Sequence, residues 1–177
     1  LLRAAAKLRT RVPDLLLVFV GGASVSDDRS EALRQLAAEL DLRDHVVWAG
    51  ARPHSEIPWW LAAADLFALA SRREGCCNAL LEALACGRPV VATAVGGNPE
   101  IVSGPGLGRL VAPADPAALA DALGEVLALR WSPAAIRAAV ESRGWERTAD
   151  EVERVWARAA GRAPADGRGG TRRREAS

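Results

Sequence analysis

Two kinds of hydrophobic pattern alternate along this chain. Short runs of consecutive apolar residues, such as Leu15 to Val20, are bounded by glycine, proline or aspartate, which is typical of strands buried on both faces of a parallel sheet. Between these runs, apolar residues recur every three or four positions, as on one face of a helix. The predicted strands span residues 15–20, 45–48, 66–70, 89–93 and 107–111. The predicted helices span residues 1–11, 28–40, 55–64, 78–86, 116–129, 132–142 and 145–160.

This regular alternation of strand and helix predicts an α/β fold with a doubly wound parallel sheet of the Rossmann-like type. In such a sheet, ligands bind in the crevice at the carboxyl ends of the strands. The loops that reach this crevice cover residues 21–28, 49–55, 71–78 and 94–100. One domain is predicted over residues 1–160. Residues 161–177 are rich in glycine, arginine and polar residues without apolar periodicity, and we predict a disordered tail there.

Composition narrows the classes of function. The 177 residues suffice for one compact domain with a sizeable core, and the net charge of +1 gives no electrostatic reason to expect nucleic acid as a partner. No apolar run reaches the roughly 18–20 residues that span a bilayer. The chain begins inside a predicted helix and without an initiator methionine, so we expect it to be a fragment of a longer protein.

The cysteines are Cys76, Cys77 and Cys86. An odd count with one adjacent pair is not a disulfide framework, and the spacing matches no zinc site. We therefore expect reduced thiols, no bound metal and a cytoplasmic location.

The segment from Ser71 to Glu82 carries the most informative side chains. Asn78, a favourable N-cap residue, is expected to begin a helix whose free amides face the crevice, where they favour phosphate oxygens. Glu74 on the loop and Glu82 about one turn into the helix can each accept two hydroxyl hydrogen bonds. A nucleotide sugar supplies both phosphates and hydroxyls. Spacing alone leaves open the alternative that both carboxylates are solvated surface charges.

Glu74 and Glu82 match the E-x7-E motif of retaining glycosyltransferases with the GT-B fold, and the chain resembles family 4 of these enzymes. The resemblance extends over WAGARPHSEIPWWLAAADLFALAS (residues 48–71), REGCCNALLEALACGRPVVATAVGGNPEIV (73–102) and GPGLGRLVAPADPAALADAL (104–123). It covers residues 1–160 in all. It implies that the chain is the C-terminal, donor-binding half of a GT-B fold.

The resemblance also implies roles for individual positions. Glu74 would hold hydroxyls of the transferred sugar and is the predicted catalytic residue, and Glu82 would accept the ribose hydroxyls of the nucleotide. The backbone amides expected at the donor are those of Gly75, Cys76 and Cys77 beside the sugar and of Asn78 and Ala79 beside the diphosphate.

Further loops complete the implied donor site. Ala51 and Arg52 would lie against the base. Gly21, Gly96 and Gly97 would let the backbone approach the ligand closely, which glycine permits. Turn formation alone is the alternative explanation for these glycines.

The resemblance implies transfer of a sugar from a UDP-, GDP- or ADP-sugar with retention at the anomeric carbon, without a metal or other cofactor. It also implies a separate N-terminal acceptor domain, which this chain lacks, and we expect the chain alone to have an incomplete active site. An arginine and a lysine that family members carry near the start of this domain are absent too, and Cys77 stands where relatives commonly have proline or glycine.

Two other functions are compatible with a Rossmann-like sheet. A non-catalytic module that binds a nucleotide sugar remains an alternative, since a donor half can bind without transferring. A nicotinamide-dependent oxidoreductase is disfavoured, because the loop GGASVS at residues 21–26 lacks the GxGxxG spacing.

Overall fold

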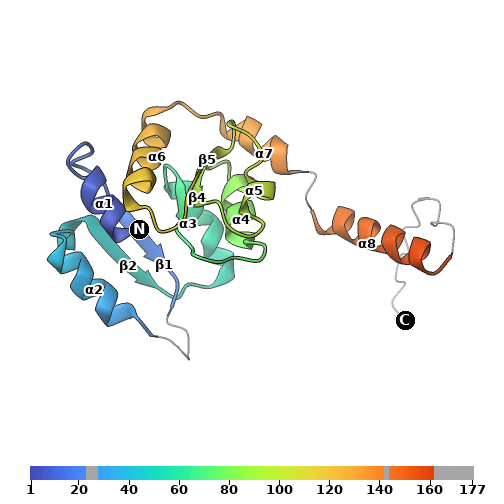
Figure 1. Cartoon of the computed structure of the whole chain (residues 1–177), viewed down its shortest axis with the longest axis horizontal. Coiled ribbons are helices and arrows are strands. Elements are labelled where there is room, and N and C mark those ends of the chain that lie inside the picture. The colour runs from blue at the N-terminus through green and yellow to red at the C-terminus, as the bar shows by residue number, and fades with distance from the viewer. Residues whose placement is uncertain (23–27, 142–143, 162–177) are drawn as a thin grey trace, which may run out of the picture. The chain divides into compact units, whose positions relative to one another are not determined.

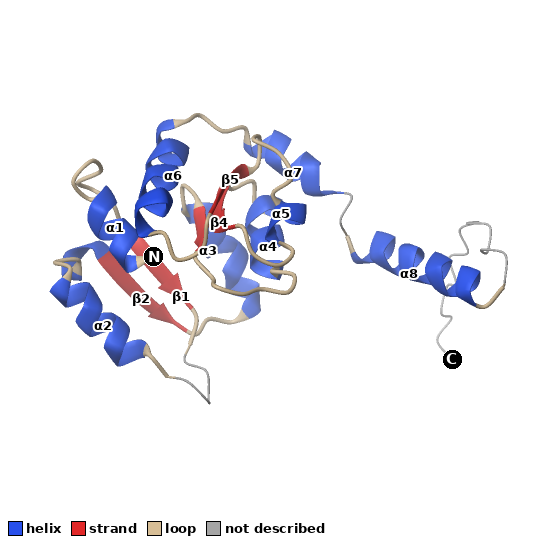
Figure 2. Cartoon of the chain, viewed as in Figure 1, coloured by secondary structure: helices blue, strands red, loops and turns tan. Residues whose placement is uncertain are grey.

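The computed structural model describes residues 1–22, 28–141 and 144–161, and Figures 1 and 2 show its elements. The strands are β1 (Leu17–Val20), β2 (Val46–Gly50), β3 (Phe67–Leu69), β4 (Val90–Thr93) and β5 (Gly108–Val111). The helices are α1 (Leu2–Leu8), α2 (Ser30–Glu39), α3 (Ile57–Ala63), α4 (Asn78–Ala85), α5 (Asn98–Ile101), α6 (Pro116–Ala128), α7 (Pro133–Glu141) and α8 (Trp145–Ala159). Every predicted strand and helix is present, and α5 is an addition.

All recorded strand pairings are parallel, which confirms the predicted fold class. Strand β1 pairs with β2, with Leu17 opposite Val46. Strand β4 lies between β3 and β5, with Val90 opposite both Phe67 and Gly108. The sequence predicted one continuous sheet, whereas the described strands form a two-stranded sheet and a separate three-stranded sheet.

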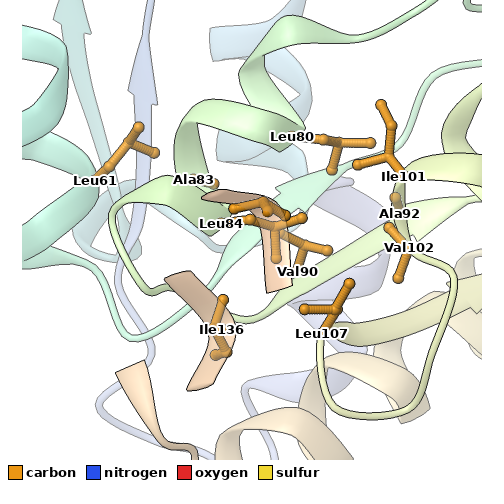
Figure 3. Close-up of a cluster of buried hydrophobic side chains, with 11 residues drawn as sticks. Leu61, Leu80, Ala83, Leu84, Val90, Ala92, Ile101, Val102, Leu107 and Ile136 are labelled. Carbon is orange, nitrogen blue, oxygen red and sulfur yellow. The ribbon is translucent and has the colours of Figure 1, made fainter. Parts of the chain in front are cut away.

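Helices cover both faces of the three-stranded sheet, as doubly wound topology requires. Because side chains alternate across a strand, Val90 and Ala92 face one side and Val91 faces the other. The first side packs against α3, α4, α5 and α7 in the apolar cluster drawn in Figure 3. Val91 packs against α1 and α6.

The ends of helix α4 are set by local backbone geometry. Its N-cap residue is Cys77, and no side chain caps the helix, so the prediction that Asn78 is the N-cap is wrong; Asn78 is the first helical residue. At the other end, Gly87 has a φ of +72°, the left-handed conformation that glycine adopts most readily. The amide of Gly87 donates to Leu84 and that of Arg88 to Ala83, which is a Schellman motif.

Strand β1 departs from the prediction that it is buried on both faces. Phe19 stacks on Trp48, with 4.7 Å between ring centroids, on the face covered by α1 and α2. On the opposite face, Val18 lies beside Val47, and each is 40% exposed. Only one face of this sheet is therefore fully covered among the described residues.

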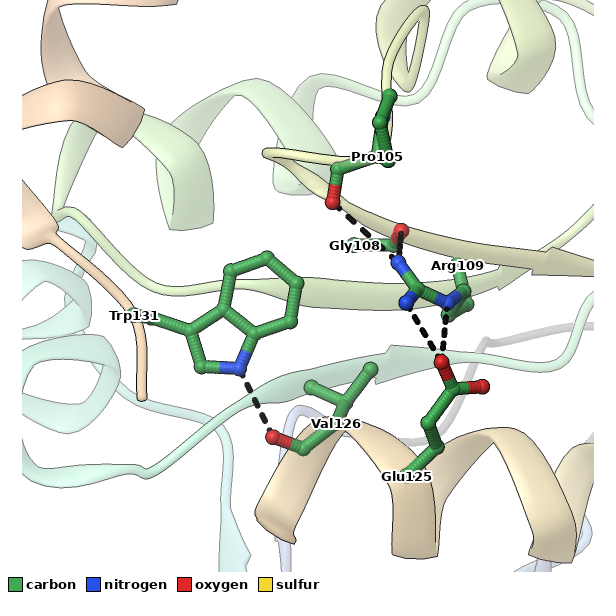
Figure 4. Close-up of polar contacts among 6 residues, drawn as sticks. All are labelled: Pro105, Gly108, Arg109, Glu125, Val126 and Trp131. Atoms are coloured by element: carbon green, nitrogen blue, oxygen red, sulfur yellow. Dashed lines mark hydrogen bonds and ion pairs between the residues drawn. The ribbon is translucent and has the colours of Figure 1, made fainter. Parts of the chain in front are cut away.

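An arginine fixes the segment that enters β5 (Figure 4). The guanidinium of Arg109 donates to the carboxylate of Glu125 on α6 and to the carbonyl oxygens of Pro105 and Gly108. Nearby, Asp115 accepts hydrogen bonds from two amides of the first turn of α6, so it caps that helix.

The chain divides into two compact units, residues 1–141 and 142–177. The described part of the second unit is α8 with Gly144 before it. Along α8, Val152, Val155 and Trp156 are exposed. The domain end predicted at residue 160 stays a prediction, and residues 162–177 of the predicted tail lie outside the described residues.

Candidate functional site

The carboxyl ends of β3 and β4 are joined by a side-chain hydrogen bond. The hydroxyl of Thr93, a buried residue at the end of β4, donates to the carbonyl oxygen of Ser71 at 2.7 Å. Ser71 begins the loop that carries Glu74. The end of β4 therefore fixes where this loop leaves the sheet.

Gly96 and Gly97 hold the same loop by direct backbone contact. The amide of Gly97 donates to the carbonyl oxygen of Gly75 at 2.8 Å, and a Cβ at position 97 would lie 2.9 Å from that oxygen. Gly96 has a φ of +52°, and a Cβ there would overlap the carbonyl of Glu74. Both positions thus need glycine for close approach to the Glu74 loop, which turn formation alone does not explain. Their predicted approach to a ligand stays a prediction.

Asn98 is a structural residue of this site that the sequence analysis missed. It is fully buried, and its side-chain amide donates to the carbonyl oxygen of Thr93 at 2.9 Å. Its Oδ1 is buried without a hydrogen-bond partner in the described structure. The signal was the Asn98-Pro99 pair in a predicted loop, since proline favours the first turn of a helix, here α5.

The N-terminus of α4 presents unsatisfied amides. The amide of Leu80 donates to the carbonyl oxygen of Cys77 at 3.1 Å, whereas within the described residues the amides of Asn78 and Ala79 have no recorded acceptor. The first turn contains no acidic residue. The helix dipole and these amides together favour an anion at this end.

The two predicted carboxylates are half-buried, not fully solvated. Glu74 lies in the loop after β3 that Gly96 and Gly97 contact, and Glu82 is the fifth residue of α4. No hydrogen bond or ion pair is recorded for either carboxylate in the described part of the chain. Both therefore retain their capacity to accept hydroxyl hydrogen bonds.

A second group of predicted residues gathers at the ends of β1 and β2. The amide of Gly21 donates to Gly50 at 2.9 Å, and a Cβ on Gly22 would lie 3.2 Å from the Cβ of Ala51. Adjacent to Ala51, Arg52 is held in place. Its Nε donates to the carbonyl oxygen of Ala49 at 3.0 Å, and its guanidinium lies 5.5 Å from the ring centroid of Trp60.

The predicted residues thus fall into two groups along the chain. One is the Glu74 loop and the start of α4 (residues 74–79 and Glu82) with Gly96 and Gly97, and the other is Gly21 with Ala51 and Arg52. Between the two sheets lies a cavity of about 430 Å³. Its lining includes Phe19, Ala70, Arg72 and Thr93, all at or just beyond carboxyl ends of strands. None of the predicted site residues lines it.

The described residues contain no cluster of three or more histidine, cysteine or acidic side chains able to hold a metal ion. No helix among them has the length and hydrophobicity needed to cross a membrane.

The chain is similar in sequence to known glycosyltransferases, two of which serve as examples. The chain is 40% identical over 135 residues to the GDP-mannose-dependent alpha-(1-6)-phosphatidylinositol monomannoside mannosyltransferase of Mycolicibacterium smegmatis, covering 72% of this chain and 34% of the relative. It is 39% identical over 173 residues to the D-inositol 3-phosphate glycosyltransferase of Salinispora tropica, covering 90% and 35%. The chain therefore spans about a third of the length of these relatives.

Solved structures and a family match agree with these relatives. Sucrose-phosphate synthase from Thermosynechococcus elongatus superposes with a TM-score of 0.73 at 28% identity, over 90% of this chain and 42% of that one. Anabaena HepE in complex with UDP superposes with a TM-score of 0.60 at 26% identity, over 81% and 43%. Residues 1–128 match the family of glycosyl transferases group 1. The chain belongs to this family, and its fold is that of the C-terminal half of a GT-B glycosyltransferase.

Proposed function

We propose that this chain is the donor-binding half of a retaining glycosyltransferase that uses a nucleoside diphosphate sugar. The observation that carries the proposal is the backbone hydrogen bond from Gly97 to Gly75. It holds the Glu74 loop directly before the free amides at the start of α4. A carboxylate and an anion-binding helix end then lie next to one another in the chain. This combination suits a ligand that has a diphosphate with a sugar attached.

Each part of the site has a chemical task in this proposal. The amides of Asn78 and Ala79 bind diphosphate oxygens, while those of Gly75, Cys76 and Cys77 border the sugar. Glu74 accepts hydrogen bonds from sugar hydroxyls. Glu82, one turn into the helix, accepts them from the ribose, and an ionised carboxylate is well suited to either pair of hydroxyls.

The base would lie over the loops that follow β1 and β2. Ala51 lies against Gly22, and the Arg52 side chain contacts Ala49 and Trp60. Gly21, just after β1, has no side chain between its backbone and the proposed position of the base. HepE is a protein of this fold in complex with UDP, and the Mycolicibacterium relative is named as GDP-mannose-dependent. Uracil and guanine are therefore candidates, and the ADP-sugar that the family resemblance also implies is tested beside them.

In the proposed reaction, the bond between the anomeric carbon and the diphosphate oxygen breaks, and a bond from an acceptor oxygen forms on the same face of the sugar. The acceptor hydroxyl loses its proton, and the nucleoside diphosphate leaves with the bonding electrons. Amides at the start of α4 stabilise the charge that develops on that leaving group. The acceptor, its binding domain and the proton acceptor belong to the rest of the whole protein. We expect the reaction to occur in the cytoplasm and to need no metal.

Calorimetric titration of the chain with UDP-, GDP- and ADP-sugars tests donor binding. We expect saturable binding of one nucleotide class, weakened roughly ten- to hundredfold by Glu82→Ala, since hydrogen bonds to a charged group contribute roughly 1.5–3 kcal/mol. Glu39→Ala is the matched control, because Glu39 is exposed at the C-terminal end of α2, and the chain continues from there to the amino end of β2, away from the carboxyl ends of the strands. Equal binding by wild type and Glu82→Ala would contradict the proposed role of Glu82.

Turnover distinguishes a transferase from a module that only binds. The whole protein, incubated with the donor found by calorimetry and candidate acceptors, should give a glycoside whose anomeric configuration, read by NMR, equals that of the donor. Inversion would exclude the retaining mechanism. Donor binding without transfer to any acceptor would favour the non-catalytic module.

A further inference from the structure

Strand β5 has one edge without a strand partner. Among the residues that the structure describes, β5 pairs with β4 on one side and with no strand on the other. The carbonyl oxygens of Leu107 and Val111 accept hydrogen bonds from amides on the β4 side. Because backbone groups alternate in direction along a strand, the amides and carbonyls of Gly108 and Leu110 point away from β4. An edge of this kind is a template for pairing with another chain.

A hollow of about 330 Å³ borders the same part of the strand. Its lining consists of residues 102–105, which lead into β5, and of Gly108, Arg109 and Leu110 in the strand. Both residues whose backbone points outward therefore lie beside open space. A second strand has room to approach this edge.

The side chain of Arg109 lies across the edge. It leaves β5 on the face covered by α6, where its Nε donates to the carboxylate of Glu125 at 2.9 Å. Its Nη1 donates to the carbonyl oxygen of Gly108 at 3.0 Å and to that of Pro105 at 3.3 Å (Figure 4). Because the Gly108 carbonyl points away from β4, the guanidinium reaches the outer side of the strand. It occupies an acceptor that an incoming strand would need.

We propose that Arg109 keeps the free edge of β5 from pairing with the same edge of a second copy of this chain. Charged side chains on edge strands are one means by which proteins prevent edge-to-edge association. Homodimers are most often two-fold symmetric, and β5 has only four residues. A two-fold pairing of this strand therefore brings the Arg109 side chains of both copies close together, and like charges opposed across a strand pair are destabilising. The inference is independent of the proposed function.

A second arginine on the same helix provides a matched control. Arg11, in the turn after α1, forms an ion pair with Asp121 of α6, as Arg109 does with Glu125. The Arg11 side chain is 51% exposed and that of Arg109 is 30% exposed. Arg11 belongs to no strand, so its removal changes the charge of the chain without uncovering a sheet edge.

The test compares leucine substitutions at the two arginines. Arg109→Leu and Arg11→Leu remove the same charge and introduce the same apolar side chain, but only the first uncovers the edge of β5. Sedimentation equilibrium measures the self-association of each variant and of the wild type. We expect Arg109→Leu to associate at least about tenfold more tightly than Arg11→Leu, since a two-fold contact counts each substitution twice. Hydrogen exchange of the Leu110 amide should slow in the associated form.

A proline identifies the strand edge as the contact. Because the Leu110 amide points outward, Leu110→Pro removes no hydrogen bond to β4 but cannot donate to a second strand. Adding Leu110→Pro to Arg109→Leu should therefore restore the monomer, and an unchanged urea midpoint shows that the fold is retained. Arg109→Gln adds no apolar surface and should associate more tightly than Arg11→Gln. This pair decides the question if leucine at position 109 disturbs folding.

Equal association of the matched Arg109 and Arg11 variants would overturn the proposal. Association of Arg109→Leu that persists after Leu110→Pro would overturn it as well, because the contact would then lie elsewhere on the chain. So would an associated form in which the Leu110 amide exchanges as fast as it does in the monomer.

Discussion

The amide nitrogen of Gly97 lies 2.8 Å from the carbonyl oxygen of Gly75, so that the loop after β4 holds the loop after β3 by its backbone. Gly96, beside it, is packed against the carbonyl of Glu74. The conformation of the Glu74 loop therefore depends on residues about twenty positions later in the chain. Substitutions at these glycines should therefore displace the Glu74 loop.

Gly96→Ala should separate the two loops. Alanine at a φ of +52° costs about 1–2 kcal/mol, and its Cβ would overlap the carbonyl of Glu74, so one loop must move. We expect a free energy of unfolding lower by about 2 kcal/mol in urea titration, and a loss of nucleotide-sugar affinity of tenfold or more by calorimetry.

Gly106→Ala is the control for this prediction, because a Cβ at Gly106 would meet open space and its φ is not in the left-handed region. It should bind ligand as the wild type does. If Gly96→Ala binds equally well, the Glu74 loop is not positioned by Gly96.

The apolar cluster beneath α4 supports the same loop from below. Leu84 is fully buried in it (Figure 3). Leu84→Ala should lower the free energy of unfolding by about 3 kcal/mol, because the space left by the deleted side-chain atoms cannot close completely. Leu129→Ala, at a side chain 46% exposed, removes the same atoms and should cost less than about 1 kcal/mol. Similar losses for the two variants in urea titration would contradict the packing described here.

Local patterns were sufficient to predict most elements. Helix α4 was expected over residues 78–86 and spans Asn78–Ala85; β4 was expected over residues 89–93 and spans Val90–Thr93. These boundaries depend on nearby residues, such as Gly87 and the apolar run itself. The parallel fold class followed from their alternation.

Other features depend on residues far apart in the chain. The contact of Gly96 with the Glu74 carbonyl needs the positions of two loops, and the buried amide of Asn98 needs the end of β4. Neither leaves a periodic signal. The separation of the sheet was also unpredictable, because the apolar run at Leu15–Val20 is the same whether or not a second strand pairs with it.

Cys86 should react slowly with alkylating reagents. Burial raises the pKa of its thiol above the usual value of 9.0, so less of it is thiolate at pH 8, and the thiolate is the nucleophile. Cys76 is exposed. Mass spectrometry after treatment with iodoacetamide should show Cys76 modified first, by about tenfold or more in rate, with the Cys86 rate increasing as pH rises from 8 to 10. Faster modification of Cys86 would show that it is more accessible than described.

Glu151 gives α8 a pH dependence with a defined sign. A hydrogen bond from Arg147, at 2.9 Å between Nε and Oε1, is the main cause that lowers the pKa of Glu151 below 4.5. A lowered pKa in the helix means stabilisation that is fully present above pH 4.5 and is lost as pH falls through the lower, helical pKa. NMR titration of the carboxyl carbon should show this pKa, and Arg147→Gln should return it toward 4.5. Arg158→Gln, on the same helix, is the control. An unchanged Glu151 titration in Arg147→Gln would show that the pair does not persist in solution.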